Sequence, residues 1–217
     1  MFTEITLACT ELSLGIAGVS SCYFYTRLAS KYQYFSFYIW FTILTNCLAL
    51  YFQSTGYNLF LLPIYSFVEL FIFSIIYLRF FLKGEKRILQ GLLLLAHGLI
   101  LLDFLFLCDL FNAKTFYAFS KVVADLSIIL LCLRYYWTIL KEDTPINKEL
   151  LLLNSIFVGY FSINSILFLS INFLVNESLD LVTPFWVLNA LSALFLYSFL
   201  TYMIWQHGRI QKTSPSG

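Results

Sequence analysis

The feature that most constrains this chain is a series of apolar stretches, each long enough to cross a lipid bilayer. A spanning helix needs about 20 predominantly apolar residues. Short polar segments separate seven stretches that meet this requirement, at residues 5–26, 34–54, 58–82, 88–111, 116–140, 149–174 and 181–205. The sequence therefore predicts an all-α integral membrane bundle of seven helices, in which short loops make consecutive helices antiparallel neighbours.

The composition agrees with a chain that is solvated by lipid. Of its 217 residues, 60% are hydrophobic and only 12% are charged, whereas soluble domains are about half apolar and a quarter charged. The net charge of +1 gives no field that would attract nucleic acid. We expect one transmembrane domain over residues 1–207, followed by a polar cytoplasmic tail at 208–217.

The basic residues predict the orientation of the bundle, because cytoplasmic segments of membrane proteins are rich in Lys and Arg. With the N-terminus outside, Lys114 is the single basic residue in an outer segment and Lys121 lies within a helix. The cytoplasmic segments then hold the remaining 11 of the 13 basic residues: Arg27, Lys31, Arg79, Lys83, Lys86, Arg87, Arg134, Lys141, Lys148, Arg209 and Lys212. The sequence thus predicts an N-terminus outside and a C-terminus in the cytoplasm.

A faint internal repeat appears in the two halves of the chain. An asparagine, a proline near the outer end of the next helix and a further polar residue recur in the same order: Asn46, Pro63 and Glu69, then Asn164, Pro184 and Asn189. This pattern is compatible with a three-plus-one-plus-three arrangement, in which the fourth helix links two parallel repeats.

Ionisable side chains within a bilayer are costly, and they mark either a site or a structural pair. Glu11, Glu69, Asp103, Lys121 and Asp125 all fall at the centre or in the outer half of the predicted helices. Lys121 and Asp125 are spaced i, i+4, so they share a helical face and can pair directly. Asp103 lies at a similar depth and can join them. Two interpretations stay open: a proton-sensitive or cation-binding pocket that opens to the outside, or an internal ion pair that fixes helix packing.

Other polar residues lie at the depth of these charges. His97 is close in depth to Glu69, so a hydrogen bond between the two is possible, although the rotations of their helices are unknown. Asn164, Asn189 and Trp186 fall at the level of the carboxylates and are candidates for the wall of the same pocket.

Several known kinds of membrane protein do not fit this sequence. Helix seven has no Lys for a retinal Schiff base, and two His are too few for the three-His zinc site of the seven-helix hydrolases. The five cysteines are scattered singly, which favours apolar packing over disulfides or zinc. We expect no cofactor and no metal.

One stretch, residues 57–70, combines a polar-aromatic turn with an aromatic run that ends in a glutamate. It reads Tyr57-Asn58-Leu59-Phe60, then Pro63-Ile64-Tyr65-Ser66-Phe67-Val68-Glu69-Leu70. It resembles a pattern in uncharacterised small polytopic bacterial membrane proteins. The resemblance implies a bacterial cytoplasmic membrane as the location and a role for Glu69, and it implies no known activity.

These observations favour a non-enzymatic multi-pass protein with a polar pocket in the outer half of the bundle, which binds, senses or transports a small ligand. Aromatic residues seal the predicted inner half, which favours sensing through a membrane signalling or transport partner. One alternative is an intramembrane enzyme that acts on a lipid, with a carboxylate or His97 as general base. The other is a structural subunit whose charges dock a second membrane protein.

Overall fold

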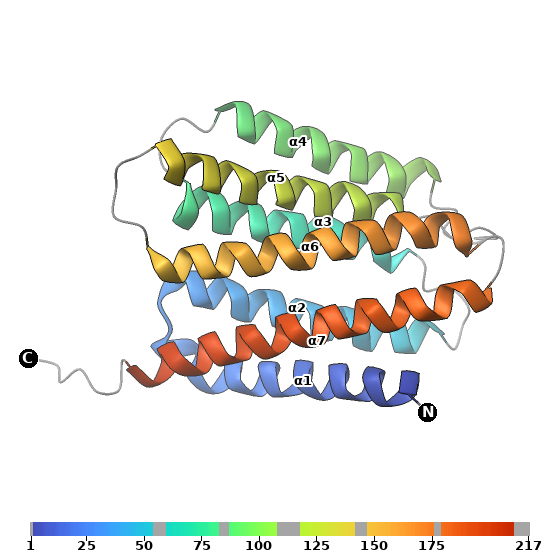
Figure 1. Cartoon of the computed structure of the whole chain (residues 1–217), viewed down its shortest axis with the longest axis horizontal. Coiled ribbons are helices and arrows are strands. Elements are labelled where there is room, and N and C mark those ends of the chain that lie inside the picture. The colour runs from blue at the N-terminus through green and yellow to red at the C-terminus, as the bar shows by residue number, and fades with distance from the viewer. Residues whose placement is uncertain are drawn as a thin grey trace, which may run out of the picture. The chain divides into compact units, whose positions relative to one another are not determined.

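The computed structural model describes residues 2–53, 60–82, 87–107, 118–141, 147–175 and 179–210, and their regular structure is entirely helical. Seven helical segments in these ranges are long and apolar enough to cross a membrane, and two of them reach this length with the π-helical turns that follow α3 and α4. This part of the sequence prediction is confirmed. In chain order (Figure 1), the α-helices are α1 (Phe2–Phe24), α2 (Ser30–Gln53), α3 (Leu61–Ile76), α4 (Arg87–Leu102), α5 (Phe119–Lys141), α6 (Lys148–Leu174) and α7 (Leu179–Ile210).

The observed helix ends differ from the expected ones where polar residues continue a helix beyond its apolar stretch. α2 begins at Ser30, ahead of the predicted residue 34, and α7 runs to Ile210 rather than 205. α3 starts at Leu61 with Pro63 in its first turn, where a proline is tolerated because the first N–H groups lack helical partners. The expected tail at 208–217 therefore begins later, and residues 211–217 lie outside the described ranges.

Two helices end in π-helical turns, at Tyr77–Phe81 after α3 and at Asp103–Leu107 after α4. Such turns are rare and are often found at functional sites. The second π-helical turn begins at Asp103, one of the candidate site residues.

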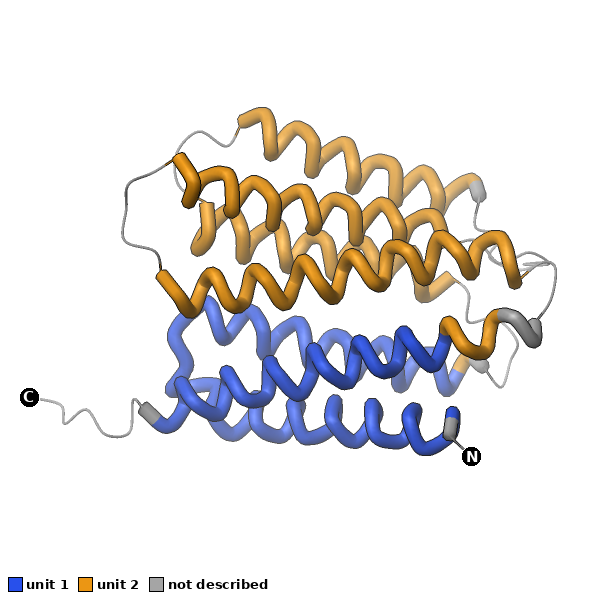
Figure 2. The backbone as a smooth tube through the Cα atoms, viewed as in Figure 1, with its two compact units in different colours: residues 1–51, 186–217 blue, residues 52–185 orange. Residues whose placement is uncertain are grey.

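The chain divides into two compact units, which Figure 2 colours separately. Unit 1 comprises Met1–Tyr51 and Trp186–Gly217, and unit 2 comprises Phe52–Phe185. This division groups α3 with α4, α5 and α6, so it does not coincide with two three-helix repeats on either side of α4. The repeat stays a prediction.

In unit 1, hydroxyl groups and small residues join α1 to α2 and α7. Thr10 Oγ1 donates a hydrogen bond of 3.0 Å to the carbonyl of Ala190 on α7. A Cβ atom added at Gly18 would lie 2.5 Å from Cδ1 of Ile43 on α2. The glycine therefore permits a close approach of these two helices, as small residues do in membrane bundles.

In unit 2, α5 packs against α3, α4 and α6, and aromatic side chains fill the space between α3 and α6. The ring of Phe73 contacts Phe157 and Phe161 edge to face, with centroid distances of 5.1 and 4.9 Å. This is the geometry that aromatic pairs prefer. These contacts hold α3 and α6 in a fixed relation beside α5.

The start of α6 shows how a local signal sets a helix boundary. The side chain of Asn147 accepts hydrogen bonds from the backbone N–H groups of Glu149 and Leu150, at 3.1 and 3.2 Å. Asparagine is a preferred N-cap residue because its side chain satisfies N–H groups that have no helical partner. Glu149 in the first turn adds a favourable interaction with the helix dipole.

Candidate functional site

Three charged side chains meet inside unit 2, and we call them the charged triad: Glu69 on α3 with Lys121 and Asp125 on α5. Nζ of Lys121 lies 2.6 Å from Oε2 of Glu69 and 2.5 Å from Oδ1 of Asp125. Both carboxyl residues are fully buried, and Lys121 is 2% exposed. The expected i, i+4 pairing of Lys121 with Asp125 is therefore confirmed, and Glu69 completes the group from the neighbouring helix.

Aromatic residues surround the triad. The hydroxyl of Tyr65 donates a hydrogen bond of 3.0 Å to Oε1 of Glu69, one helical turn away. Nζ of Lys121 also lies 5.5 Å from the ring centroid of Phe161, 5.7 Å from that of Tyr65 and 5.9 Å from that of Phe168. Ring faces attract cations at such distances, so the ammonium group is stabilised by rings as well as by carboxylates.

The triad is unbalanced in charge and in hydrogen bonding. Two carboxylates and one ammonium sum to −1 when all three are ionised. Within the described residues, Oδ2 of Asp125 is buried and has no hydrogen-bond partner. An unpaired ionised oxygen in a low-dielectric interior is strongly unfavourable. The triad therefore offers one acceptor to an additional positive charge.

Lys121 and Asp125 lie in the first two turns of α5, whereas Glu69 lies near the middle of α3. With a rise of about 1.5 Å per residue, Lys121 is roughly 3 Å and Asp125 roughly 9 Å along α5 from its first residue. Glu69 is roughly 12 Å along α3 from Leu61. Lys121 therefore lies within the first turn of α5.

The predicted depth of Asp103 suggested that it joins Lys121 and Asp125, but the structure places it outside the charged triad. Its Oδ2 accepts hydrogen bonds from the backbone N–H of Ser120, at 3.1 Å, and from the Ser120 hydroxyl. The side-chain oxygen of Asn172 on α6 accepts a 3.0 Å bond from the N–H of Ala118. The two residues thus cap the start of α5, whose first N–H groups lack helical partners and favour a negative charge. Asp103 fixes the turn that carries Lys121.

His97 does not form the hydrogen bond to Glu69 that equal depth allowed. Its Nδ1 lies 2.7 Å from the carbonyl of Leu93 on its own helix, and its Nε2 is buried with no hydrogen-bond partner in the described part of the chain. The rings of Phe67 and Phe71 on α3 contact the imidazole edge to face. These residues sit two positions on either side of Glu69, so Glu69 points to a different face of α3. This environment gives no support to His97 as a general base.

The remaining candidates divide between the two units. Asn164 on α6 is buried and belongs to unit 2 with the charged triad. Trp186, which is 39% exposed, and Asn189 lie on α7 in unit 1. The structure therefore describes them apart from the triad, and their place in the wall of a common pocket stays a prediction.

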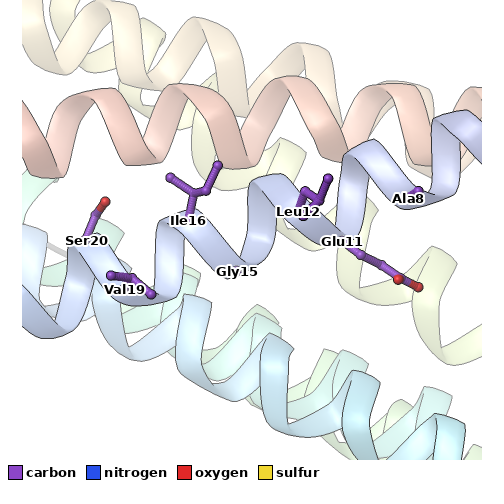
Figure 3. Close-up of a pocket in the computed structure, with 7 residues that line it drawn as sticks. All are labelled: Ala8, Glu11, Leu12, Gly15, Ile16, Val19 and Ser20. Atoms are coloured by element: carbon purple, nitrogen blue, oxygen red, sulfur yellow. The ribbon is translucent and has the colours of Figure 1, made fainter.

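Glu11 is an exposed residue of α1 in unit 1. It lines an open groove of about 710 Å³ together with Ala8, Leu12, Gly15, Ile16, Val19 and Ser20, as Figure 3 shows. A second groove beside it, of about 810 Å³, is lined by residues of α1 and α2 that include Trp40 and Ile43. The triad lines neither groove. Because Glu11 belongs to unit 1 and the triad to unit 2, its place beside the charged site stays a prediction.

Two residues that support the triad were not anticipated. Tyr65 precedes Glu69 by four positions, so its contact was readable from the i, i+4 rule. Ser120 had no such signal, because its role depends on the rotation of α4 against α5. Among the described residues, no group of three His, Cys, Asp or Glu side chains is arranged to hold a metal ion.

Comparison with known protein families, with curated proteins and with solved structures finds no match to this chain. The resemblance over residues 57–70 stays a prediction, and Tyr57, Asn58 and Leu59 lie outside the described ranges. The charged triad itself is therefore the basis for a functional proposal.

Proposed function

We propose that this chain is a multi-pass membrane protein that binds a small solute bearing a positive group at the charged triad, in order to sense or transport it. The observation that carries the proposal is the composition of the triad, two carboxylates against one ammonium, buried in a helix unit suited to a membrane. A structural ion pair would need one carboxylate. The second one leaves a negative charge that a cationic ligand can neutralise.

The geometry favours an amine-bearing or zwitterionic solute. An ammonium group of a solute can donate to Oδ2 of Asp125, the oxygen without a partner. The rings of Tyr65, Phe161 and Phe168 lie beside the triad and add a favourable environment for a second cation. A carboxylate on a zwitterionic solute would be attracted to Lys121.

The topology that we propose places the N-terminus outside and the C-terminus in the cytoplasm of a bacterial inner membrane. The excess of Lys and Arg in the segments after α1, α3, α5 and α7 supports this orientation. In this orientation α5 begins on the outer side, so Lys121 and Asp125 lie in the outer half of the membrane. A solute would reach them past the start of α5, where Asp103 holds Ser120. Sensing would require a partner protein, and transport would require a second opening toward the cytoplasm.

Ligand-induced stabilisation of the full chain in lipid nanodiscs tests the proposal. The probes are choline, putrescine, glycine and lysine, with acetate and glucose as controls at matched ionic strength. A ligand that binds the folded state raises Tm in proportion to RT ln(1 + [L]/Kd). We expect at least one positively charged or zwitterionic probe to raise Tm in the wild type and in Glu11→Gln, and to leave Tm unchanged in Asp125→Asn.

Three results would contradict the proposal. In the first, none of the probes raises the Tm of the wild type. In the second, acetate or glucose stabilises the protein while the cations do not, so the charge class of the ligand is wrong. In the third, a cationic probe stabilises Asp125→Asn as much as the wild type, and the binding site lies elsewhere.

A further inference from the structure

We propose that, before any solute binds, a proton resides on Oδ2 of Asp125 and supplies the positive charge that the charged triad lacks. This inference rests on the proposed function, because it names the occupant of the same site in its resting state. The step is the transfer of one proton from a hydronium ion of the surrounding water to Oδ2 of Asp125. One O–H bond of the hydronium ion breaks, one O–H bond forms on Asp125, and a water molecule is left. The transfer leaves a neutral acid beside the Lys121–Glu69 ion pair.

The hydrogen bonds determine which oxygen takes the proton. Both oxygens of Glu69 already accept, Oε1 from Tyr65 and Oε2 from Lys121, which is the arrangement of an ionised carboxylate. On Asp125, Oδ1 accepts from Lys121, whereas Oδ2 is buried with no partner within the described residues. A buried neutral hydroxyl without a partner is far less unfavourable than a buried charge without one. Oδ2 of Asp125 is therefore the protonated atom.

The charged groups that face Asp125 come from two helices. Lys121 lies on the same helix as Asp125, and Glu69 lies on α3. The Lys121 ammonium contacts both carboxylates. Among the described residues, Tyr65 is a further titratable group at the triad, and its hydroxyl is bound to Glu69. The ammonium stabilises one carboxylate at full strength, and it cannot neutralise both.

Among the described residues of α4 and α6, which also pack on α5, no printed contact brings a further charge to the triad. α6 places the rings of Phe161 and Phe168 beside the Lys121 ammonium. Its charged residues, Lys148 and Glu149, lie in its first turn, about 12 residues before Phe161. On α4, the Asp103 carboxylate is bound to Ser120 at the cap of α5.

A metal cation fits the site less well than a proton does. Cations such as Mg²⁺ and Ca²⁺ take six or more oxygen ligands at about 2.0–2.6 Å. The Lys121 ammonium already occupies the position between the two carboxylates, at 2.6 Å from one and 2.5 Å from the other. Within the described residues, the triad keeps a single oxygen without a hydrogen-bond partner, Oδ2 of Asp125, and one oxygen is sufficient to bind a proton.

Proton occupancy gives the site a simple exchange. The ammonium group of a solute that donates to Oδ2 takes the place of the O–H hydrogen, so one proton leaves for each solute that binds. Solute binding would then weaken by up to about tenfold for each unit by which the pH falls, since one proton competes for the same oxygen.

Infrared spectroscopy of the full chain in nanodiscs, without solute and near neutral pH, tests the proton directly. We expect a carbonyl stretching band of a protonated carboxylic acid in the wild type, which shifts when aspartate is labelled with ¹³C and does not shift when glutamate is. The band is expected to persist in Glu11→Gln. It should be absent in Asp125→Asn, and absent also in Glu69→Gln, where Asp125 alone pairs with Lys121 as a carboxylate.

The isotope arm requires no variant, so the test remains decisive even if a substitution prevents folding. The absence of a carboxylic acid band in the wild type would overturn the proposal. A band that shifts with labelled glutamate would place the proton on the wrong residue. A band that survives unchanged in folded Asp125→Asn would assign it to another acid.

The two proposals fail separately. If a probe raises the Tm of a protein that lacks the carboxylic acid band, solute binding at the triad is supported and the protonation of Asp125 is contradicted. If the band is present and no probe changes Tm, the protonation of Asp125 is supported and solute binding is contradicted.

Discussion

Two buried polar clusters of unit 2 differ in a way that distinguishes packing from a site. The first is the charged triad. The second, which we call the neutral network, links Tyr77, Cys132 and Asn154. The Tyr77 hydroxyl donates to the side-chain oxygen of Asn154 at 2.8 Å and lies 2.9 Å from Sγ of Cys132, while Nδ2 of Asn154 donates to the Cys132 carbonyl at 3.2 Å.

The buried polar groups of the neutral network are more completely hydrogen-bonded than those of the charged triad. Every side chain of the neutral network is uncharged and hydrogen-bonded, so its atoms are satisfied where they lie. With all three of its groups ionised, the triad would carry an excess negative charge, and within the described residues Oδ2 of Asp125 has no hydrogen-bond partner. A cluster that serves packing alone is most stable when it is neutral and complete. The charged triad is therefore the cluster that offers a group to a ligand, Oδ2 of Asp125.

The largest difference between the clusters is expected when Lys121 is replaced by Met. This change leaves Glu69 and Asp125 facing each other without a cation, and breaking a buried ion pair in this way lowers the free energy of unfolding by about 3–5 kcal/mol. Unfolding in mixed micelles of mild detergent and SDS measures the loss. The matched control is Lys141→Met, whose ammonium lies at the end of α5 over the ring of Trp137. Equal stability of the two variants would show that the triad does not depend on Lys121.

A smaller loss is expected from Tyr77→Phe in the neutral network. The substitution removes one hydroxyl and leaves the side-chain oxygen of Asn154 without its donor, which lowers the free energy of unfolding by about 1–3 kcal/mol. The exposed Tyr202→Phe serves as the control in the same titration. If Tyr77→Phe destabilises the chain more than Lys121→Met, the comparison reverses and the neutral network is the principal polar contact of unit 2.

Much of the fold was predictable because the bilayer imposes its own length on each helix. Seven apolar stretches gave the seven helices, whereas the ends of α2 and α7 were not predictable. Polar residues such as Ser30 and Gln206 continue these helices beyond their apolar stretches, and hydropathy gives no signal for a helix that extends among polar residues. Orientation and the internal repeat remain predictions.

The candidate site was predictable in depth and in one contact. The spacing of Lys121 and Asp125 predicted their pairing. Depth alone placed Asp103 at a similar level and Glu69 nearer the centre of its helix. Sequence gives no information about the rotation of one helix against another. That rotation turns Glu69 toward Lys121, Asp103 toward Ser120 and the His97 ring toward phenylalanines.

A still smaller effect is expected at the cap that links α4 to α5. Ser120→Ala removes the hydroxyl that donates to Asp103 and keeps the backbone N–H bond. We expect a loss of about 1–2 kcal/mol in the free energy of unfolding, as for a capping bond to a charged group. Ser127→Ala is the control, because its hydroxyl bonds only the Val123 carbonyl of its own helix. A loss no greater than that of the control would show that Asp103 does not secure the start of α5.

The smallest effect is expected from Asp125→Asn, and it sharpens the comparison most. The substitution is nearly isosteric and leaves Lys121 paired with Glu69, so the charges of the triad sum to zero. We expect the free energy of unfolding to stay within about 0.5 kcal/mol of the wild type, or to rise, as when a residue kept for function is replaced. The same unfolding titration measures it beside Lys121→Met. If Asp125→Asn instead loses about as much stability as Lys121→Met, both carboxylates are needed to hold the ammonium. The triad would then serve packing, as the neutral network does, and its second carboxylate would be explained without a ligand.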